Sequence, residues 1–170
     1  MPLSMYQASV PAFLHTFANL SAILDKAVAH ADARKIDHNA LLGARFFPDM
    51  FPLVRQIPLA SDIAKNGTAR LAGIQPPKFA DNETSFEELK ERIAKTVDFL
   101  KSLKPEQVDG SEARDVIFPV GGKPRTFKGQ EYLVNWVLPN FYFHATTTYA
   151  LLRHNGVELG KLDFLGKVGS

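Results

Sequence analysis

The sequence predicts an all-α protein, a four-helix bundle with a short β-hairpin inserted before the last helix. Apolar residues recur at steps of three and four along four stretches of the chain, which is the spacing of one face of an α-helix. Between the third and fourth stretches this rhythm breaks at a glycine pair flanked by two short strand-like runs. The 170 residues contain no internal repeat, so we expect one domain over residues 1–170.

The first helix is predicted over residues 5–33, where an apolar stripe continues for about eight turns. Ser4 is the expected N-cap, and Pro11 removes one backbone hydrogen bond inside the helix. His15 and His30 also fall within this span. Histidines on such helices are most often exposed or simply hydrogen-bonded, and that interpretation is favoured for both.

Residues 37–50 are predicted to form a connection with one or two helical turns, started by Asp37 and stopped by Pro48. Large apolar side chains crowd the end of this segment, namely Phe46, Phe47, Met50 and Phe51. The favoured interpretation is that they cap one end of the core. The alternative is that they form a dimer contact, because aromatic residues are common in both settings.

The second helix is predicted over residues 51–71, with Gly73 as its stop. The buried stripe of this helix consists largely of small residues, which permits close approach to a neighbouring helix, and Pro58 predicts a local kink. Three polar residues of the same helix are interpreted as solvated positions: Arg55, Gln56 and Asp62.

The third helix is predicted to end near Leu103 and to start at one of two overlapping capping boxes. One box pairs Thr84 with Glu87, and the other pairs Ser85 with Glu88. A clear apolar face follows, made by Phe86, Leu89, Ile93, Val97 and Leu100.

A β-hairpin is predicted from residues 115–120 and 123–127, which flank the pair Gly121-Gly122. The hairpin is basic, with Arg114, Lys123, Arg125 and Lys128. Nucleic-acid binding is not expected, because no aromatic platform accompanies these residues and the net charge is only +2. The basic residues are interpreted as a solvated face.

The fourth helix is predicted between Gly129 and Gly156, kinked or delayed by Pro139 and closed by a left-handed cap at Asn155-Gly156. In the tail, Phe164 and Leu165 are expected to pack back on the bundle. The stripe of the fourth helix that faces the core contains polar residues among apolar ones: Leu133, Val137, Asn140, His144, Thr147 and Leu151.

Composition excludes several classes of function. The chain has no cysteine, so disulfides, thiol nucleophiles and Cys-based zinc sites are excluded. The first residues lack the features of a signal peptide, and no run of about 18 apolar residues occurs. We therefore expect a cytoplasmic protein that is not membrane-bound. No Gly-x-Ser-x-Gly motif marks a nucleophile.

Asn140 and His144 are the residues from which a ligand site is predicted. They are four positions apart, so their side chains lie on one side of a helix about 6 Å apart along its axis. His154 lies about 15 Å further along and roughly 80° away around the axis, so it cannot join His144 on one metal ion. With no His-x-x-x-His or His-Glu-x-x-His motif, the local sequence supplies one strong metal ligand, and the favoured interpretation is a buried hydrogen-bonded network.

Residues 141–161, FYFHATTTYALLRHNGVELGK, resemble the last helix of the DinB-like superfamily, whose members typically carry a His-x-x-x-His pair before a Leu-Leu-Arg and a Gly-Val. This alignment places His144 on the second histidine of that pair and Asn140 on the first. Together with residues 4–27 and 49–73, the segment is similar to a family of unknown function within that superfamily.

The resemblance implies a DinB-like four-helix bundle, usually dimeric, with a divalent metal held by three histidines. In this chain the metal histidine of the second helix falls near Gln56, and Asn140 replaces another. Amide oxygens are poor substitutes for imidazole nitrogen, so no metal site is expected. We expect a homodimer instead. Its small-molecule ligand is expected to bind at Gln56, Asn140, His144, Thr148 and His15. Whether it is an enzyme stays open at this point.

Two alternatives remain. The first is a divalent-metal-dependent thiol transferase or isomerase of the DinB-like type, in which zinc or nickel binds His144 and residues such as Asp62 or His15 complete the coordination. The second is a structural or interaction protein that associates through Phe46, Phe47 and Phe51.

Overall fold

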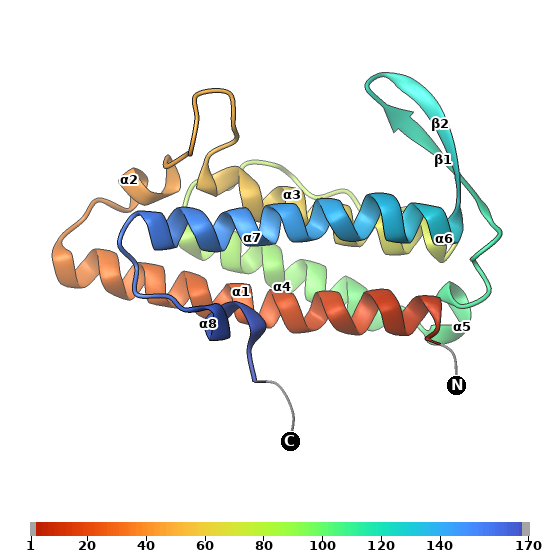
Figure 1. The fold of residues 1–170 in the computed structure, drawn as a ribbon, viewed down its shortest axis with the longest axis horizontal. Helices are drawn as coiled ribbons and strands as arrows, with labels where there is room; N and C mark the ends of the chain where they lie inside the picture. The colour runs from red at the N-terminus through yellow and green to blue at the C-terminus, as the bar shows by residue number, and fades with distance from the viewer. Residues whose placement is uncertain (1–2, 168–170) are drawn as a thin grey trace.

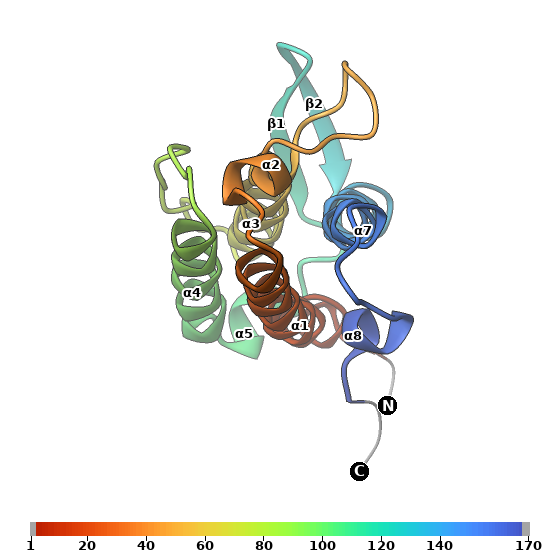
Figure 2. The same ribbon diagram turned by 90° about the vertical axis from the view of Figure 1, so that its left-hand side faces the viewer.

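Four long helices run side by side in the structure, a computed structural model that describes residues 3–167 (Figure 1). They are α1 (Met5–Arg34), α3 (Leu53–Leu71), α4 (Phe86–Ser102) and α7 (Leu138–His154). Seen along its length in Figure 2, the bundle has α3 packed between α4 and α7, with α1 completing it against the same two helices. The predicted all-α bundle with a hairpin before the last helix is confirmed.

The core is built from aromatic and aliphatic side chains that all four helices contribute. Phe13 and Phe17 of α1 meet Phe141 of α7 edge to face, with ring centroids 4.6 and 5.2 Å apart. Leu53 of α3 and Phe86 of α4 are fully buried in the same cluster. Each such side chain contributes about 1.5–3 kcal/mol on burial, so the packed apolar faces hold the helices together.

The helix starts follow the predicted capping chemistry. The Ser4 hydroxyl accepts a hydrogen bond from the Gln7 backbone N–H, and the Ser4 backbone N–H donates to the side-chain oxygen of Gln7. At α4 the cap is Ser85, whose hydroxyl accepts from the backbone of Glu88. The backbone N–H and the hydroxyl of Thr84 donate to the Glu88 carboxylate, so Ser85 is the cap and the predicted pairing of Thr84 with Glu87 is not formed.

The connection between α1 and α3 contains one helical turn, α2 (His38–Leu42), with Asp37 as its N-cap. The prediction that the following aromatic residues cap the core is wrong. Residues 43–52 stand out from the bundle as a loop (Figure 1), and the side chain of Phe47 is 64% exposed. Phe46 and Phe51 are exposed as well. The loop leaves all three rings exposed, and Phe46 meets the exposed ring of His154 at the end of α7.

A second short helix, α5 (Pro105–Val108), was not predicted and precedes the hairpin of β1 (Asp115–Val120) and β2 (Lys123–Lys128). The strands are antiparallel, with Val120 opposite Lys123 across the glycine turn. The hairpin extends beyond the helices (Figure 1). One face of the hairpin is anchored on the bundle, where Phe118 stacks on Phe127 and meets Tyr132 edge to face.

The last long helix is continuous but not uniform. It begins as α6 (Gly129–Glu131), widens into the π-helix η1 (Tyr132–Val137) and continues as α7. Pro139 has no N–H to give to the carbonyl four residues earlier, and within η1 the N–H of Leu138 bonds the Leu133 carbonyl five residues back. The helix begins at Gly129, so Pro139 does not delay it, and the wider helical turn of η1 precedes the proline.

Gly67 lets α3 approach η1 closely. A Cβ atom at this position would lie 2.7 Å from a methyl carbon of Val137. The close approach that small residues predict for the second helix occurs at this contact.

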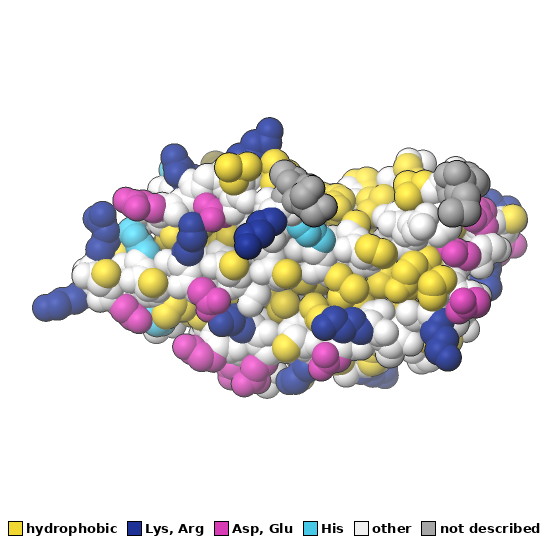
Figure 3. Space-filling view, turned by 90° about the horizontal axis from the view of Figure 1, so that it is seen from below, with side chains coloured by type: hydrophobic (Ala, Val, Ile, Leu, Met, Phe, Trp, Pro, Cys, Tyr) yellow, Lys and Arg dark blue, Asp and Glu magenta, His cyan; other side chains and the backbone are white. Residues whose placement is uncertain are grey.

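The C-terminal segment packs beside α1. Its helix α8 (Lys161–Leu165) places the ring centroid of Phe164 6.0 Å from that of Tyr149, as predicted for Phe164. Leu165 is exposed, so the prediction that it packs on the bundle is wrong. Figure 3 shows the α1 face of the molecule, where hydrophobic side chains gather toward the end at which α1 begins. Within the described residues, no helix has the length and apolar character needed to cross a membrane.

Candidate functional site

Gln56 of α3 and His144 of α7 meet where the two helices pack together. The Nδ1 atom of His144 lies 2.8 Å from Oε1 of Gln56. The other end of the Gln56 amide, Nε2, donates to the backbone carbonyl of Phe51 at 2.8 Å. Gln56 is only 1% exposed, so its prediction as a solvated residue is wrong. The structure brings together two residues far apart in the chain, both of them predicted site residues.

This arrangement determines which nitrogen of His144 carries the proton. The Phe51 carbonyl only accepts hydrogen bonds, so the Gln56 amide must present its NH₂ group there and its oxygen to the imidazole. Nδ1 must then be the N–H donor, and in the neutral ring Nε2 carries the lone pair. Among the residues that the structure describes, none is hydrogen-bonded to Nε2.

Burial keeps the His144 ring uncharged at neutral pH. Desolvation by the surrounding protein lowers the pKa of His144 below its ordinary value of 6.5, because the charged imidazolium loses its hydration. The residue is nevertheless partly exposed. A neutral imidazole with an available Nε2 lone pair can accept a hydrogen bond from a ligand or take up a proton.

The neighbouring predicted residues Asn140 and Thr148 are turned toward their own helix. Nδ2 of Asn140 donates to the carbonyl of Trp136 at 2.7 Å, and the hydroxyl of Thr148 donates to the carbonyl of His144 at 2.9 Å. Thr148 is fully buried. These bonds leave the Asn140 oxygen as the second acceptor near His144, one helical turn away.

The structure does not bring His15 to this group. His15 is exposed on α1, and its Nε2 lies 2.6 Å from the carbonyl of Leu165 in α8. That contact attaches the C-terminal segment to the bundle. His154 is also separate, and its ring meets the ring of Phe46 at 5.6 Å.

The three-histidine metal site that the DinB-like resemblance implies does not fit the residues present. Both polar atoms of the Gln56 amide are already hydrogen-bonded, and Asn140 offers only an amide oxygen, a poor ligand for zinc or nickel. His144 alone offers an imidazole nitrogen. Across residues 3–167, no three His, Cys, Asp or Glu side chains are grouped so that they could hold a metal ion.

A buried arginine forms a second polar cluster, which sequence reasoning missed. Arg92 of α4 is 2% exposed, and its guanidinium donates to Asp62 and Glu83 at 2.8 Å and to Asp81 at 3.2 Å. It also donates to the Ser61 hydroxyl and the Ala80 carbonyl. A signal was available, because Arg92 lies three residues after Leu89 on the apolar face of its helix.

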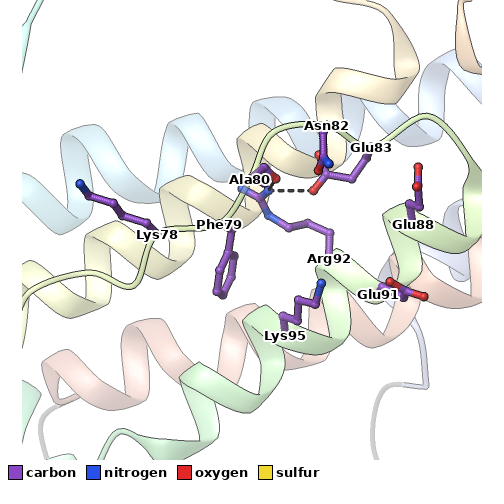
Figure 4. Close-up of a pocket in the computed structure, with 9 residues that line it drawn as sticks. All are labelled: Lys78, Phe79, Ala80, Asn82, Glu83, Glu88, Glu91, Arg92 and Lys95. Carbon is purple, nitrogen blue, oxygen red and sulfur yellow. Dashed lines mark hydrogen bonds and ion pairs between the residues drawn. The ribbon is translucent and has the colours of Figure 1, made fainter.

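Figure 4 shows the cavity of about 460 Å³ beside this arginine. The segment of residues 78–83 crosses it, with Phe79 on one side and the Glu83 carboxylate bonded to Arg92 on the other. Lys65 of α3 secures the same segment, since its ammonium donates to the carbonyl of Pro77 and lies 4.3 Å from the Phe79 ring centre. The cluster therefore fixes the loop that joins α3 to α4.

Comparison with known proteins identifies relatives of the whole chain. A family model described as a domain of unknown function, DUF1993, matches residues 5–165. The chain is also similar to a solved structure described as the crystal structure of a DinB family member protein from Shewanella denitrificans at 1.83 Å resolution. The two chains are 39% identical, with a TM-score of 0.88, and the match covers 97% of this chain and 93% of that chain. No curated protein matches the chain.

Proposed function

This chain belongs to the DUF1993 family and has the DinB-like fold, and from that premise we propose that it acts as a homodimer that binds a small molecule at His144. The observation that carries the proposal is the hydrogen bond between Gln56 and Nδ1 of His144. It holds the neutral ring in one orientation and leaves Nε2 as an acceptor. The ligand class that suits this atom is a small molecule with a hydroxyl or N–H donor.

Exposed aromatic rings beside the site support the dimer. Phe143 lies next to the His144 ring, with the two centroids 5.2 Å apart, and Phe51 provides the carbonyl that Gln56 binds. Phe46, Phe47, Phe51 and Phe143, which we call the aromatic rim, are all exposed. A second copy packed on the aromatic rim would remove apolar area from water and screen His144 from bulk solvent.

Ligand binding is tested by NMR of the histidine ring signals, with the His144 signals assigned from the His144→Gln variant. A set of small alcohols, phenols and amides is added at up to about 10 mM, tenfold above a millimolar Kd. We expect donor-bearing compounds to shift the His144 signals saturably, while a phenol and its methyl ether differ by about tenfold in affinity. No response of His144 to any of these compounds would contradict the proposal.

The dimer is tested by light scattering. We expect the wild-type mass to be twice that of the 18.8 kDa chain, and Phe47→Glu to give the single-chain mass. Ile117→Glu is the matched control, because Ile117 is equally exposed but lies on the hairpin. A wild-type monomer would remove the dimer from the proposal without affecting the ligand test.

Metal analysis separates the proposal from the metal-dependent thiol transferase or isomerase. The protein is purified without chelator, and bound zinc and nickel are measured in the wild type and in His144→Ala. Stoichiometric metal that is lost in the variant would overturn the ligand-binding proposal in favour of that alternative.

A further inference from the structure

A polar stripe on α3, far from His144, lines two adjoining cavities. The stripe consists of Asp62, Asn66 and Arg70, spaced four residues apart along one side of the helix, and all three line both cavities. One cavity, of about 320 Å³, lies between α3 and the segment of residues 75–79. The other, of about 100 Å³, lies between α3 and η1. Arg70 is about 21 Å along the helix from Gln56, and neither cavity is lined by Gln56 or His144.

Arg70 is held rigidly in the groove and has no carboxylate partner among the described residues. Its guanidinium carbon lies 4.6 Å from the centre of the Phe118 ring, and its Nη1 donates to the phenol oxygen of Tyr132 at 2.9 Å. Both aromatic residues are buried. Burial raises the pKa of Tyr132, so the phenol stays neutral and cannot serve as the counter-ion.

The remaining hydrogen-bonding capacity of Arg70 is large. A guanidinium has five N–H donors, and the Tyr132 oxygen uses one of them. The nearby carboxylate of Asp62 is already bound by Arg92 and Lys65, each at 2.8 Å. A half-buried, preorganised guanidinium with free donors is a typical site for a planar oxyanion, which it can bind through two parallel hydrogen bonds.

The lining of the two cavities indicates the shape of that anion. The smaller cavity is mostly apolar, with Leu59, Ile63, Val137 and the indole of Trp136 around it. Apolar cavities of roughly 150 Å³ hold a benzene ring, so this one suits a smaller group such as a short branched alkyl chain. Inorganic phosphate has no apolar part to occupy this cavity, so the lining favours an anion that carries an alkyl group.

We propose that the groove along Asp62, Asn66 and Arg70 binds a small monocarboxylate with a short apolar body. The carboxylate pairs with the guanidinium of Arg70. The alkyl chain occupies the smaller cavity beside Trp136, and the larger cavity is the polar entrance. This site does not depend on the ligand or the dimer proposed at His144.

The test uses the fluorescence of Trp136, which is the only tryptophan in the chain and lines the smaller cavity. Isovalerate is added to the full-length protein at up to about 10 mM, with isovaleramide as its uncharged counterpart. We expect a saturable change with isovalerate and at least about tenfold weaker binding of the amide. This comparison needs no substitution, so it stays informative even if a variant fails to fold.

Two variants attribute the effect to Arg70. Arg70→Gln is expected to weaken isovalerate binding by about tenfold or more, whereas Arg55→Gln, which changes another half-buried arginine of α3, is expected to leave it within about twofold. Three results would overturn the proposal: no saturable response, equal binding of the acid and the amide, or tighter binding of inorganic phosphate than of isovalerate.

Discussion

The amide of Gln56 holds the imidazole of His144 in one orientation across the interface between α3 and α7. Its oxygen accepts the Nδ1 proton at 2.8 Å, and its nitrogen is fixed by the Phe51 carbonyl. A glutamine therefore occupies the position at which the DinB-like resemblance leads one to expect a metal ligand, and it serves as a hydrogen-bond partner of the histidine. The chemistry available at His144 is that of a neutral base with its lone pair on Nε2.

Replacing Gln56 with leucine should destabilise the protein. The Nδ1 proton of His144 and the Phe51 carbonyl would both lose their partner, and a buried polar group left unsatisfied costs about 1–3 kcal/mol. Urea denaturation measures the change in the free energy of unfolding. Gln130→Leu, at an exposed position, is the control and should stay within about 0.5 kcal/mol of wild type. Equal effects of the two substitutions would contradict the importance of the buried bond.

The pKa of His144 should produce a pH dependence of stability. Burial lowers its pKa in the folded state below the ordinary value of 6.5. The unfolded chain therefore takes up the proton first as the pH falls below 6.5, and stability declines from there until the folded-state pKa is passed. NMR titration of the His144 ring gives the folded pKa directly. In His144→Gln the decline in this window should be smaller, and an unchanged pH profile would refute the assignment.

The Arg92 cluster should be essential for stability. Arg92→Met removes a buried guanidinium and leaves Asp62, Asp81 and Glu83 without it, a change that typically costs about 3–5 kcal/mol. Lys90→Met is the matched control on the same helix. Its partner Asp25 is exposed, and exposed pairs contribute less than about 1 kcal/mol. Chemical denaturation measures the free energy of unfolding of both variants. Similar decreases would show that the buried cluster stabilises the protein no more than the exposed pair does.

The effect of Gly67→Ala should depend on Val137. In the wild type the new methyl group would lie 2.7 Å from a Val137 methyl carbon, and overpacking of this kind costs about 1–3 kcal/mol. With Val137→Ala as background the clash is absent, and the higher helix propensity of alanine should stabilise α3 by about 1 kcal/mol. A double-mutant cycle measures this coupling. Additive effects would mean that the helices separate at little cost.

The fold was largely predictable because local signals agree with the tertiary structure. Ser4, Ser85 and the Gly121-Gly122 turn lie where their backbone chemistry requires, and the apolar stripes of the four helices form the core. The exposed Phe47 was not predictable in this way, because an aromatic residue in a short connection can pack inward or project outward. Loop geometry decides between the two.

The candidate site was predictable only in part. Spacing along the last helix singled out His144 and Asn140, and the resemblance pointed to Gln56. The pairing of Gln56 with His144 depends on how α3 and α7 pack, which no local pattern encodes. For Arg92, the position on an apolar helix face was a usable signal. Two of its carboxylate partners, Asp81 and Glu83, come from a loop whose course only the folded chain reveals.

The π-helical stretch η1 connects the Arg70 groove with His144. Tyr132 and Trp136 lie within η1, and His144 follows on the same continuous helix. Each residue of a regular helix turns the chain by about 100° around the axis. Deleting one residue from η1 would therefore rotate Tyr132 and Trp136 away from the Arg70 groove while leaving His144 in place. A one-residue change in length would therefore disrupt the ligand site proposed at Arg70 and spare the one proposed at His144, so the two could be lost independently in evolution.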